Sequence, residues 1–425
     1  MTKTELEAHD DAAAEQRQAM FRLMLVVIAG MFAAYALGVA KAVAVILAVV
    51  LMIMLHELGH FVTAKWGGMK VTEYFLGFGP KLWSVRKGET EYGVKALPLG
   101  GYVRIIGMHN LDEVPPEDEE RTYRRQSYPK RLAVAVAGSF MHLVIAFVLL
   151  LVLHVAVGLP AEQPRIATIS TLESGPSPAQ QAGFEPGDRF VSVDGQPFES
   201  WDWLRDYIAA RPGQEITFVV ERDGEQLTLE VVPVDRRAVD IEGADAPRVT
   251  RPTGFVGIGP EVRVEKDGPL EGAATAFGDI GRLTTQTFQA LGDLFSMEGL
   301  ESYREQLTAD RGPTRPSEDE PRLLSPVGLA RIAGQAADNG IRQVLILLVS
   351  INIFVGIFNM FPMLPFDGGH VAIATYEAIR SKLSGRRHYV DVAKLMPVTY
   401  LVFLALMFLA VTALYLDVAR PLNIQ

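Results

Sequence analysis

Five residues near the start of the chain combine metal-binding and acid/base chemistry inside an apolar stretch of membrane-spanning length. His56, Glu57 and His60 form an H-E-x-x-H sequence, and a helix brings residues four positions apart onto one face. Two imidazoles can then bind one zinc ion, with Glu57 beside them as the acid/base. The alternative is that these side chains only join helices by hydrogen bonds. The cost of an unpaired carboxylate at membrane depth favours the metal.

A catalytic zinc ion needs a third protein ligand from elsewhere in the chain, with a fourth position kept for water. The chain has no cysteine, which excludes thiolate ligands, disulfides and thiol catalysis. Asp367 is the best candidate, because it follows an apolar span in a segment where prolines break the helix and glycines allow close backbone approach. An Asp-Gly turn at the membrane surface is the alternative for Asp367. His370 is a competing ligand, although an interfacial polar position explains it more simply.

One further histidine interrupts an apolar span. His142 lies about 16 Å along a helix from Arg131, so its depth is close to that of the H-E-x-x-H pair. A histidine in a span more often bridges two helices by a hydrogen bond than binds a metal. Direct ligation, a supporting position beside the ligands and simple helix bridging all remain open for His142.

The composition indicates that a membrane protein positions these residues. The chain has 425 residues, of which 49% are hydrophobic and 21% charged. The apolar residues gather in a few stretches with mixed sequence between them, as expected when lipid surrounds some segments and water surrounds others. The net charge is −10 and no strong basic block is present, which argues against a nucleic-acid partner.

The apolar stretches predict four or five transmembrane helices. Residues 1–22 lack the features of a signal peptide, and we expect a mobile tail there. Residues 23–64 would form a helix about 63 Å long, twice the bilayer thickness, so two spans with a turn near residues 38–41 are favoured, giving five in all. The first stretch is short, and an interfacial helix is its alternative. The other predicted spans cover 132–159, 341–369 (which ends in the metal-ligand motif) and 395–416.

Basic residues predict which side of the membrane each connection faces. Segment 65–131 carries twelve Lys and Arg residues, and the connection after the fourth span is also basic. By the positive-inside rule both face the cytoplasm. Region 160–340 and the C-terminus then lie outside, and the N-terminus lies inside if there are five spans. His60 and Asp367 both fall toward the cytoplasmic ends of their helices, so they can meet.

The region outside the membrane divides into two parts. Residues 160–235 predict a compact domain of short strands, because turn signals such as Asp194-Gly195 recur along it. Residues 236–340 predict a strand at 255–258, a helix at 270–295 and a Pro- and charge-rich linker at 308–322. The expected fold class is therefore a polytopic α-helical membrane protein with an extracytoplasmic α+β domain.

Taken together, these motifs resemble the site-2 protease family of intramembrane zinc metalloproteases, and most closely the bacterial members that cleave anti-sigma factors. The resemblance covers most of the chain and rests on HELGH at 56–60, GFGP at 77–80, YGVKALPLGGY at 92–102, SPVG at 325–328 and the segment 359–369. It implies a Zn²⁺ site. The implied ligands are His56, His60 and Asp367, with Glu57 as the acid/base. Asn359 is implied to position substrate or to stabilise the developing oxyanion.

Two other segments resemble known modules. Residues 179–195, AQQAGFEPGDRFVSVDG, resemble the bacterial PDZ signature. PDZ domains bind chain ends by adding a strand to an open sheet edge, so this domain is expected to filter substrates by size or terminus, with a spacer as the alternative. Residues 68–107 resemble the family's membrane-associated β-hairpin, whose edges can hold an unwound substrate. The chain departs from the family where Gly138-Ser139 and His142 replace a Gly-Pro and a following Asn.

The predicted function is an intramembrane zinc endopeptidase of the plasma or inner membrane, with its active site toward the cytoplasm. Its expected partners are membrane lipid and transmembrane segments of pre-cleaved single-span proteins, such as anti-sigma factors or remnant signal peptides. The rival class is a membrane transporter or a PDZ scaffold in which the same side chains bind an ion. A Glu57→Gln variant that loses proteolysis but keeps its metal distinguishes the two.

Overall fold

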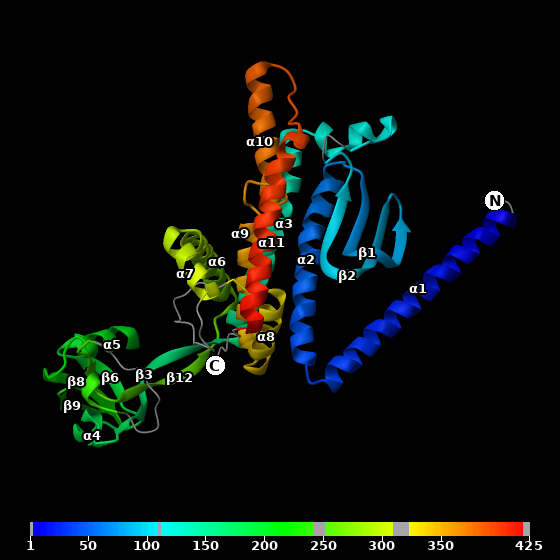
Figure 1. The fold of residues 1–425 in the computed structure, drawn as a ribbon. Coiled ribbons are helices and arrows are strands. Elements are labelled where there is room, and N and C mark those ends of the chain that lie inside the picture. The colour runs from blue at the N-terminus through cyan, green and yellow to red at the C-terminus, as the bar shows by residue number, and fades with distance from the viewer. Residues whose placement is uncertain (1–2, 109–111, 241–250, 309–322, 420–425) are drawn as a thin grey trace. The chain divides into compact units, whose positions relative to one another are not determined.

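The computed structural model describes residues 3–108, 112–240, 251–308 and 323–419 (Figure 1). The chain divides into two compact units, which we describe separately. The membrane unit comprises residues 1–157 and 268–425, and the β-rich unit comprises Gly158–Asp267. All the predicted metal ligands lie in the membrane unit.

Two helices make up the first part of the membrane unit. Helix α1 covers Lys3–Ala36 and α2 covers Ala40–Trp66. The break falls at Gly38, whose φ of +71° lies in the left-handed region that favours glycine. Segment 1–22 was expected to be a mobile tail, but its described residues belong to α1. The reason is composition, because the Ala, Glu, Gln, Arg and Met residues of this segment are strong helix formers.

Four helical segments of the described chain are long and apolar enough to cross a membrane, which confirms a polytopic helical membrane protein. They are α2, α3 (Tyr128–Val152) with its π-helical extension η3 (Leu153–Val157), α9 (Ile341–Phe358), and η5 (Val392–Leu395) continuing into α11 (Met396–Ala419). The apolar part of α1, Met20–Ala36, is shorter. Five spans stay a prediction, because this stretch is only one residue shorter than α9.

The predicted hairpin is present and folds back on itself. Strands β1 (Val71–Lys87) and β2 (Thr90–Ile105) pair antiparallel with several register shifts. Residues 73–76 of β1 pair with 91–94 of β2 on one side and with 101–104 on the other. Four strand segments therefore lie side by side, and segment 101–105 is at one edge. The Tyr74 hydroxyl donates to the Met54 carbonyl at 2.7 Å, which ties the sheet to α2. Figure 1 shows β1 and β2 beside α2.

The rest of the membrane unit is helical. It comprises η1 (Pro116–Arg121), η2 (Tyr123–Arg125), α6 (Pro269–Leu294), α7 (Met297–Thr308), α8 (Pro326–Asp338) and α10 (Asp367–Ser384). Helix α6 matches the helix predicted at 270–295, whereas α7, α8 and α10 were not predicted. Almost all of the predicted linker, from residue 309 on, lies outside the described residues.

The SPVG motif joins α8 to the last span. The buried Asp417 carboxylate of α11 accepts a hydrogen bond from the Ser325 backbone N–H at 2.7 Å, at the start of α8. A Cβ on Gly328 would lie only 2.2 Å from Asp417 Oδ2, so only glycine fits beneath this carboxylate. The motif thus stabilises a helix junction.

The β-rich unit is larger than the predicted domain. Its elements are β3 (Leu159–Ile169), β4 (Thr171–Leu172), β5 (Gly175–Pro176), α4 (Pro178–Gln181), β6 (Arg189–Val193), β7 (Gln196–Pro197), α5 (Trp201–Ala209), β8 (Ile216–Arg222), β9 (Glu225–Val231), β10 (Val234–Asp235), η4 (Arg236–Ala238), β11 (Gly254–Phe255) and β12 (Ile258–Glu265). The main sheet has the order β12-β3-β6-β8-β9. Because β12 pairs with β3, the unit continues to Asp267 instead of ending at residue 235. The strand expected at 255–258 is interrupted at Gly257, whose φ is +94°.

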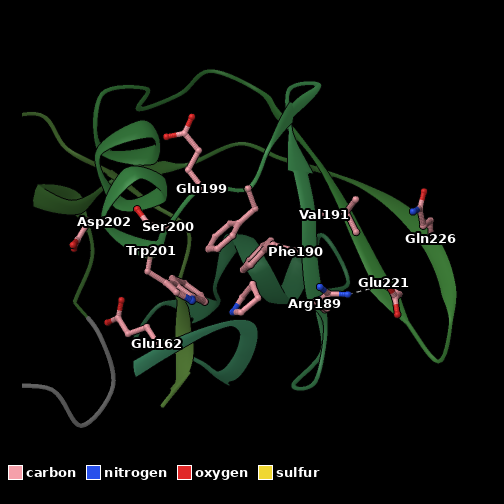
Figure 2. Close-up of a pocket in the computed structure, with 12 residues that line it drawn as sticks. Glu162, Arg189, Phe190, Val191, Glu199, Ser200, Trp201, Asp202, Glu221 and Gln226 are labelled. Carbon is pink, nitrogen blue, oxygen red and sulfur yellow. Dashed lines mark ion pairs between the residues drawn. The ribbon is translucent and has the colours of Figure 1, made fainter. Parts of the chain in front are cut away.

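A core of its own stabilises the β-rich unit. The core contains Phe190, Trp201, Leu204 and Phe218, all nearly inaccessible to solvent. A cavity of about 570 Å³ lies beside Phe190 and Trp201, with Glu162 and Glu199 among its lining residues (Figure 2). Among the described residues the one metal-ligating cluster lies in the membrane unit.

We expect the β-rich unit to lose stability in acid. The Arg222 guanidinium bonds both oxygens of buried Asp188, at 2.7 and 2.8 Å. Burial raises the pKa of Asp188, but the hydrogen bonds from Arg222 and from the Glu185 backbone outweigh it and leave this pKa below its usual range. A lowered pKa gives stability that is present above the unfolded value of about 3.9 and is lost as the pH falls through the folded value.

The measurement is urea unfolding of the full chain, followed by tryptophan fluorescence. Replacing Trp66 and Trp83 by Phe leaves Trp201 and Trp203, both in the β-rich unit, as the reporters. At pH 7, Arg222→Met should lower the free energy of unfolding by about 2 kcal/mol, and the difference from the parent should shrink below about pH 4. A difference that stays constant from pH 7 to pH 3 would contradict the assignment.

Candidate metal centre

Close packing of α2 against α3 brings the two histidines of the H-E-x-x-H sequence together. A Cβ on Gly59 would lie 2.6 Å from the Ala137 carbonyl oxygen, so the helices approach as closely as two backbones allow. A Cβ on Gly138 would lie 2.3 Å from His56 Cε1 and 2.4 Å from His60 Nε2. The bare backbone of Gly138 therefore leaves the space that both imidazoles occupy.

The orientation of His60 leaves one ring nitrogen available to a metal. His60 Nδ1 lies 2.7 Å from the Val134 carbonyl oxygen. A carbonyl oxygen can only accept, so Nδ1 carries the hydrogen and donates it. Nε2 then presents its lone pair. A backbone acceptor behind a histidine is the usual device that fixes the tautomer and ring orientation of a metal ligand.

Asp367 is delivered by the turn between α9 and α10, and it is the first residue of α10. The Gly368 N–H donates to the Asn359 carbonyl at 2.8 Å, which closes this turn. A Cβ on Gly368 would lie 2.2 Å from the Met360 carbonyl oxygen, and one on Gly369 would lie 2.6 Å from the Leu364 nitrogen. The two glycines therefore let the turn fold tightly onto the helix start, as their sequence position predicted.

The three predicted ligands fit a zinc ion. His56 Nε2 and His60 Nε2 lie 3.2 Å apart, and Asp367 Oδ2 lies 3.4 Å from the first and 3.3 Å from the second. Ligand atoms about 2.0 Å from a tetrahedral zinc ion lie about 3.3 Å from each other. Asp367 Oδ2 is also buried without a hydrogen-bond partner, which a metal would provide. Among the described residues these three form the one such cluster, and His370 is not part of it.

Glu57 lies beside the ligands and faces the β-sheet. Its side chain is partly buried. A Cβ on Gly101 of β2 would lie 3.2 Å from Glu57 Cγ. Glu57 thus stands between α2 and the edge segment 101–105, where a general base could reach a peptide that borders this edge.

Asn359 is brought to the same place by the end of α9. It caps this helix, and its Nδ2 lies 3.5 Å from His56 Nε2. The side-chain amide is a hydrogen-bond donor next to the metal ligands. The role that the resemblance implied for Asn359, positioning substrate or stabilising the oxyanion, stays a prediction.

His142 both bridges helices and lies next to a ligand. Its Nδ1 is 2.8 Å from Oδ1 of Asn352 on α9, and the pair is buried. The Asn352 amide donates to the Leu348 carbonyl at 2.8 Å and contacts Met52 Sδ at 3.2 Å. The His142 ring lies 5.0 Å from the His56 ring. His142 is not in the ligand cluster, and the sequence analysis missed Asn352, although a buried amide in an apolar span was a usable signal.

The sequence analysis also missed a buried ion pair between α3 and α10. Arg131 at the start of α3 donates to Glu377 of α10 at 2.7 Å, and both side chains are buried. The other oxygen of Glu377 accepts from the Val390 N–H at 2.6 Å. This ion pair fixes α10, which begins with Asp367, against α3, which contacts both histidines. The signal was weak, because neither residue belongs to a recognisable motif.

Comparison with known protein families identifies the family to which the chain belongs. The family model for peptidase family M50 matches residues 44–406, which include all four residues of the proposed catalytic centre. The chain belongs to peptidase family M50. The resemblance to site-2 proteases and the assignment as a zinc-dependent membrane metalloendopeptidase are thereby confirmed.

Relatives of this M50 peptidase carry the same assignment over nearly their whole length. It is 34% identical over 405 residues to "Zinc metalloprotease Rip1" of Mycobacterium tuberculosis, covering 89% of this chain and 97% of that protein. It is also 34% identical over 409 residues to "Zinc metalloprotease Rip1" of Mycolicibacterium smegmatis, with the same coverage. A PDZ domain of the SdrC-like protein from Listeria monocytogenes matches 24% of this chain and 90% of the solved chain, at 16% identity and a TM-score of 0.18.

Membership of the M50 family also decides between the two function classes. The transporter or scaffold alternative required the same histidines and carboxylates without hydrolysis. The family and the full-length relatives are peptidases, and the three ligands meet with the spacing of a tetrahedral metal. Zinc is accordingly the cofactor of this M50 peptidase, and His56 and His60 of α2 with Asp367 at the start of α10 form a possible site for it.

Proposed function

We propose that this M50 peptidase hydrolyses peptide bonds within transmembrane segments of single-span proteins that another protease has already shortened. Anti-sigma factors and remnant signal peptides are the substrate classes that the family resemblance implies. The observation that carries the proposal is the meeting of His56, His60 and Asp367 within and beside helices of membrane-spanning length. A hydrolytic site at this depth is useful only for a bond that also lies there.

Each residue of the site has a definite task in the proposed mechanism. His56, His60 and Asp367 would hold a zinc ion, which would supply the Lewis acidity that activates water near neutral pH and polarises a carbonyl. Glu57 accepts the proton of the attacking water on its carboxylate and then passes it to the leaving amine. The side-chain amide of Asn359 donates a hydrogen bond to the substrate carbonyl oxygen, which becomes negative in the transition state. The buried pair of His142 and Asn352 orients the ring of His56.

The β-sheet beside α2 gives the substrate a place to unwind. A transmembrane helix satisfies its own backbone hydrogen bonds, so a protease must replace these bonds before it can reach the peptide carbonyl. Segment 101–105 lies at a sheet edge next to Glu57, and an edge strand offers free backbone donors and acceptors. We infer that the unwound substrate adds to this edge as a strand, with its scissile bond between Glu57 and the metal ligands.

The β-rich unit is proposed to screen substrates before they reach the site. Its sheet ends in the edge strands β12 and β9. An open edge of this kind can accept a chain terminus as an additional strand, in the manner of a PDZ domain. The basic connections of the membrane unit support a cytoplasmic side for the active site of an enzyme in the plasma or inner membrane, with the β-rich unit on the opposite side.

The decisive experiment compares Glu57→Gln with the parent enzyme. Both proteins are reconstituted in lipid vesicles with a single-span substrate whose outer domain has been removed. The variant should cleave the transmembrane segment about 100-fold to 10,000-fold more slowly, since this is the usual contribution of a general base. Its zinc content should equal that of the parent, because Glu57 is not one of the ligands.

Substrate controls locate the cleavage. A soluble, unstructured peptide with the same sequence tests whether the enzyme simply prefers membrane-embedded bonds, and mass spectrometry of the fragments gives the cleaved bond. Cleavage by Glu57→Gln at the parental rate would remove the mechanism. Cleavage confined to the extramembrane part of the substrate would remove the intramembrane assignment while leaving the peptidase.

The role proposed for His142 predicts a loss of metal affinity. His142→Ala removes the ring that packs on His56 and leaves the side-chain oxygen of Asn352 without its hydrogen-bond donor, so zinc should bind about 10-fold to 100-fold more weakly. The matched variant is His142→Asn, which retains a hydrogen-bonding side chain toward Asn352 and should restore part of this affinity. Zinc competition with a chelator gives the affinities. Equal affinity in the parent and in His142→Ala would show that His142 only joins α3 to α9.

A further inference from the structure

An apolar cavity of about 490 Å³ lies behind the turn that carries Asp367. One wall is the turn itself, at Pro362–Leu364. The second wall is the face of α10 that presents Ala372 and Tyr376, and the third is the start of the last span, with Leu395 and Val398. All of these residues belong to the membrane unit, and none is a metal ligand.

The lining of the cavity suits a hydrocarbon chain and not a polypeptide. The Thr399 hydroxyl is bonded to the Leu395 carbonyl of its own helix at 3.0 Å, and the backbones of α10 and α11 are paired within each helix. Along these two helices an extended peptide would therefore find no partners for its backbone groups. A helical one would occupy about 420 Å³ for each turn, if its diameter is about 10 Å, so the cavity has room for little more than one turn.

Two cations mark one end of this cavity. Arg380 follows Tyr376 by four residues on α10, so it lies on the same face one turn farther along. Lys394 directly precedes Leu395. Because α10 runs away from the metal site and the chain then returns to begin α11 (Figure 1), both cations lie at the end of the cavity remote from the Asp367 turn.

The surroundings of these cations have the character of a membrane surface. Segment 378–394 contains five Lys and Arg residues and one acidic residue, Asp391. Lys394 is 83% exposed and 3.9 Å from Asp391, so its charge is largely available. Tyr376 and Tyr400, on the two helices that border the cavity, expose more than half of their surfaces, and exposed tyrosines are typical of the boundary between lipid and water.

We propose that the cavity binds one anionic phospholipid, with an acyl chain behind the Asp367 turn and the phosphate between Arg380 and Lys394. Apolar walls at one end and two cations near the other match the two parts of such a lipid. The acyl chain of the lipid would fill the space behind Pro362–Leu364 and so support the turn that contains Asp367. This binding requires no proteolytic activity, so it can be tested even if the proposed substrate is wrong.

The test uses the full-length protein in nanodiscs that contain phosphatidylglycerol with a photoreactive group in the acyl chain. Mass spectrometry after illumination should locate the crosslinks in peptides that contain residues 362–376 and 395–399. Ala372→Trp and Val398→Trp fill the cavity from opposite walls, and each should lower this labelling at least about fivefold, the factor that corresponds to a difference of about 1 kcal/mol. The control is Leu404→Trp, on an exposed face of α11, which should label like the parent.

A second arm tests the headgroup. Arg380→Gln and Lys394→Gln should each weaken the preference for phosphatidylglycerol over phosphatidylcholine about fivefold, while labelling by a phosphatidylcholine probe should not change. Undiminished labelling in both tryptophan variants would overturn the site. Equal labelling by the two lipids in the parent would overturn the anionic headgroup. Displacement of the lipid by a transmembrane peptide would assign the cavity to substrate instead.

Discussion

A single methyl group at Gly138 is expected to abolish zinc binding and proteolysis. The Cβ of Gly138→Ala would fall 2.3 Å from His56 Cε1 and 2.4 Å from His60 Nε2, well inside contact distance. Neither ring can yield without leaving the metal, because both are fixed on α2 and His60 is also bonded to Val134. Helices α2 and α3 must therefore separate, and displacements of about 1 Å at a reacting centre cost about 100-fold in rate.

The measurements are zinc content after dialysis and cleavage of the reconstituted substrate. We expect zinc to be lost and the cleavage rate to fall by about 100-fold or more, with the protein still inserted in the membrane. Gly278→Ala in α6 is the matched control, since nothing lies within 4 Å of its added Cβ. Full zinc content and normal cleavage in Gly138→Ala would mean that the approach of α2 to α3 is looser than the structure describes.

Replacing Glu377 by Leu should strongly destabilise the membrane unit. Glu377→Leu leaves the buried Arg131 guanidinium without its carboxylate, which typically costs about 3–5 kcal/mol. The Val390 N–H loses its acceptor as well. Because Glu377 and Asp367 belong to the same helix, zinc affinity should fall together with thermal stability. Melting of the purified protein in detergent and zinc titration measure the two effects.

The paired variant separates charge burial from packing. Arg131→Met combined with Glu377→Leu removes both charges, and such replacements are often neutral or stabilising. The double variant should therefore melt at a higher temperature than Glu377→Leu alone. If Glu377→Leu melted at the same temperature as the parent, the ion pair would be hydrated and would not contribute to stability. If the double variant were the less stable of the two, the cost would come from packing.

Local chemistry made much of the metal centre predictable. The i to i+4 spacing puts His56 and His60 on one helical face in any context, and the cost of ionisable groups in lipid gives them a reason to be there. The prolines and glycines around Asp367 predicted a broken helix, because these residues restrict or free the backbone wherever they occur. Spans were readable for a similar reason, since lipid requires long apolar runs.

Some differences between prediction and structure come from contacts between distant residues, and others come from local sequence. The end of the β-rich unit moved from residue 235 to Asp267 because β12 pairs with β3, and no local pattern specifies a partner strand. Segment 1–22 has too few apolar residues to require structure, yet it continues α1. Helix α8 was not predicted, although Ser325 caps its first N–H groups and Pro326 follows as a local start signal; the bond to Asp417, ninety-two residues away, is additional.

The sequence by itself determined the chemistry of this M50 peptidase: two histidines, a glutamate and an aspartate of defined spacing, in helices that lipid must surround. Only the tertiary structure decided which backbones approach closely enough to use that chemistry. Gly138 gives the imidazoles their space, the Arg131–Glu377 pair holds α10, and Asn352 is paired with His142. The physical reason is the sequence distance over which the interactions act. Spacing along a helix is fixed by local geometry, whereas the approach of two helices depends on side chains far apart in the chain.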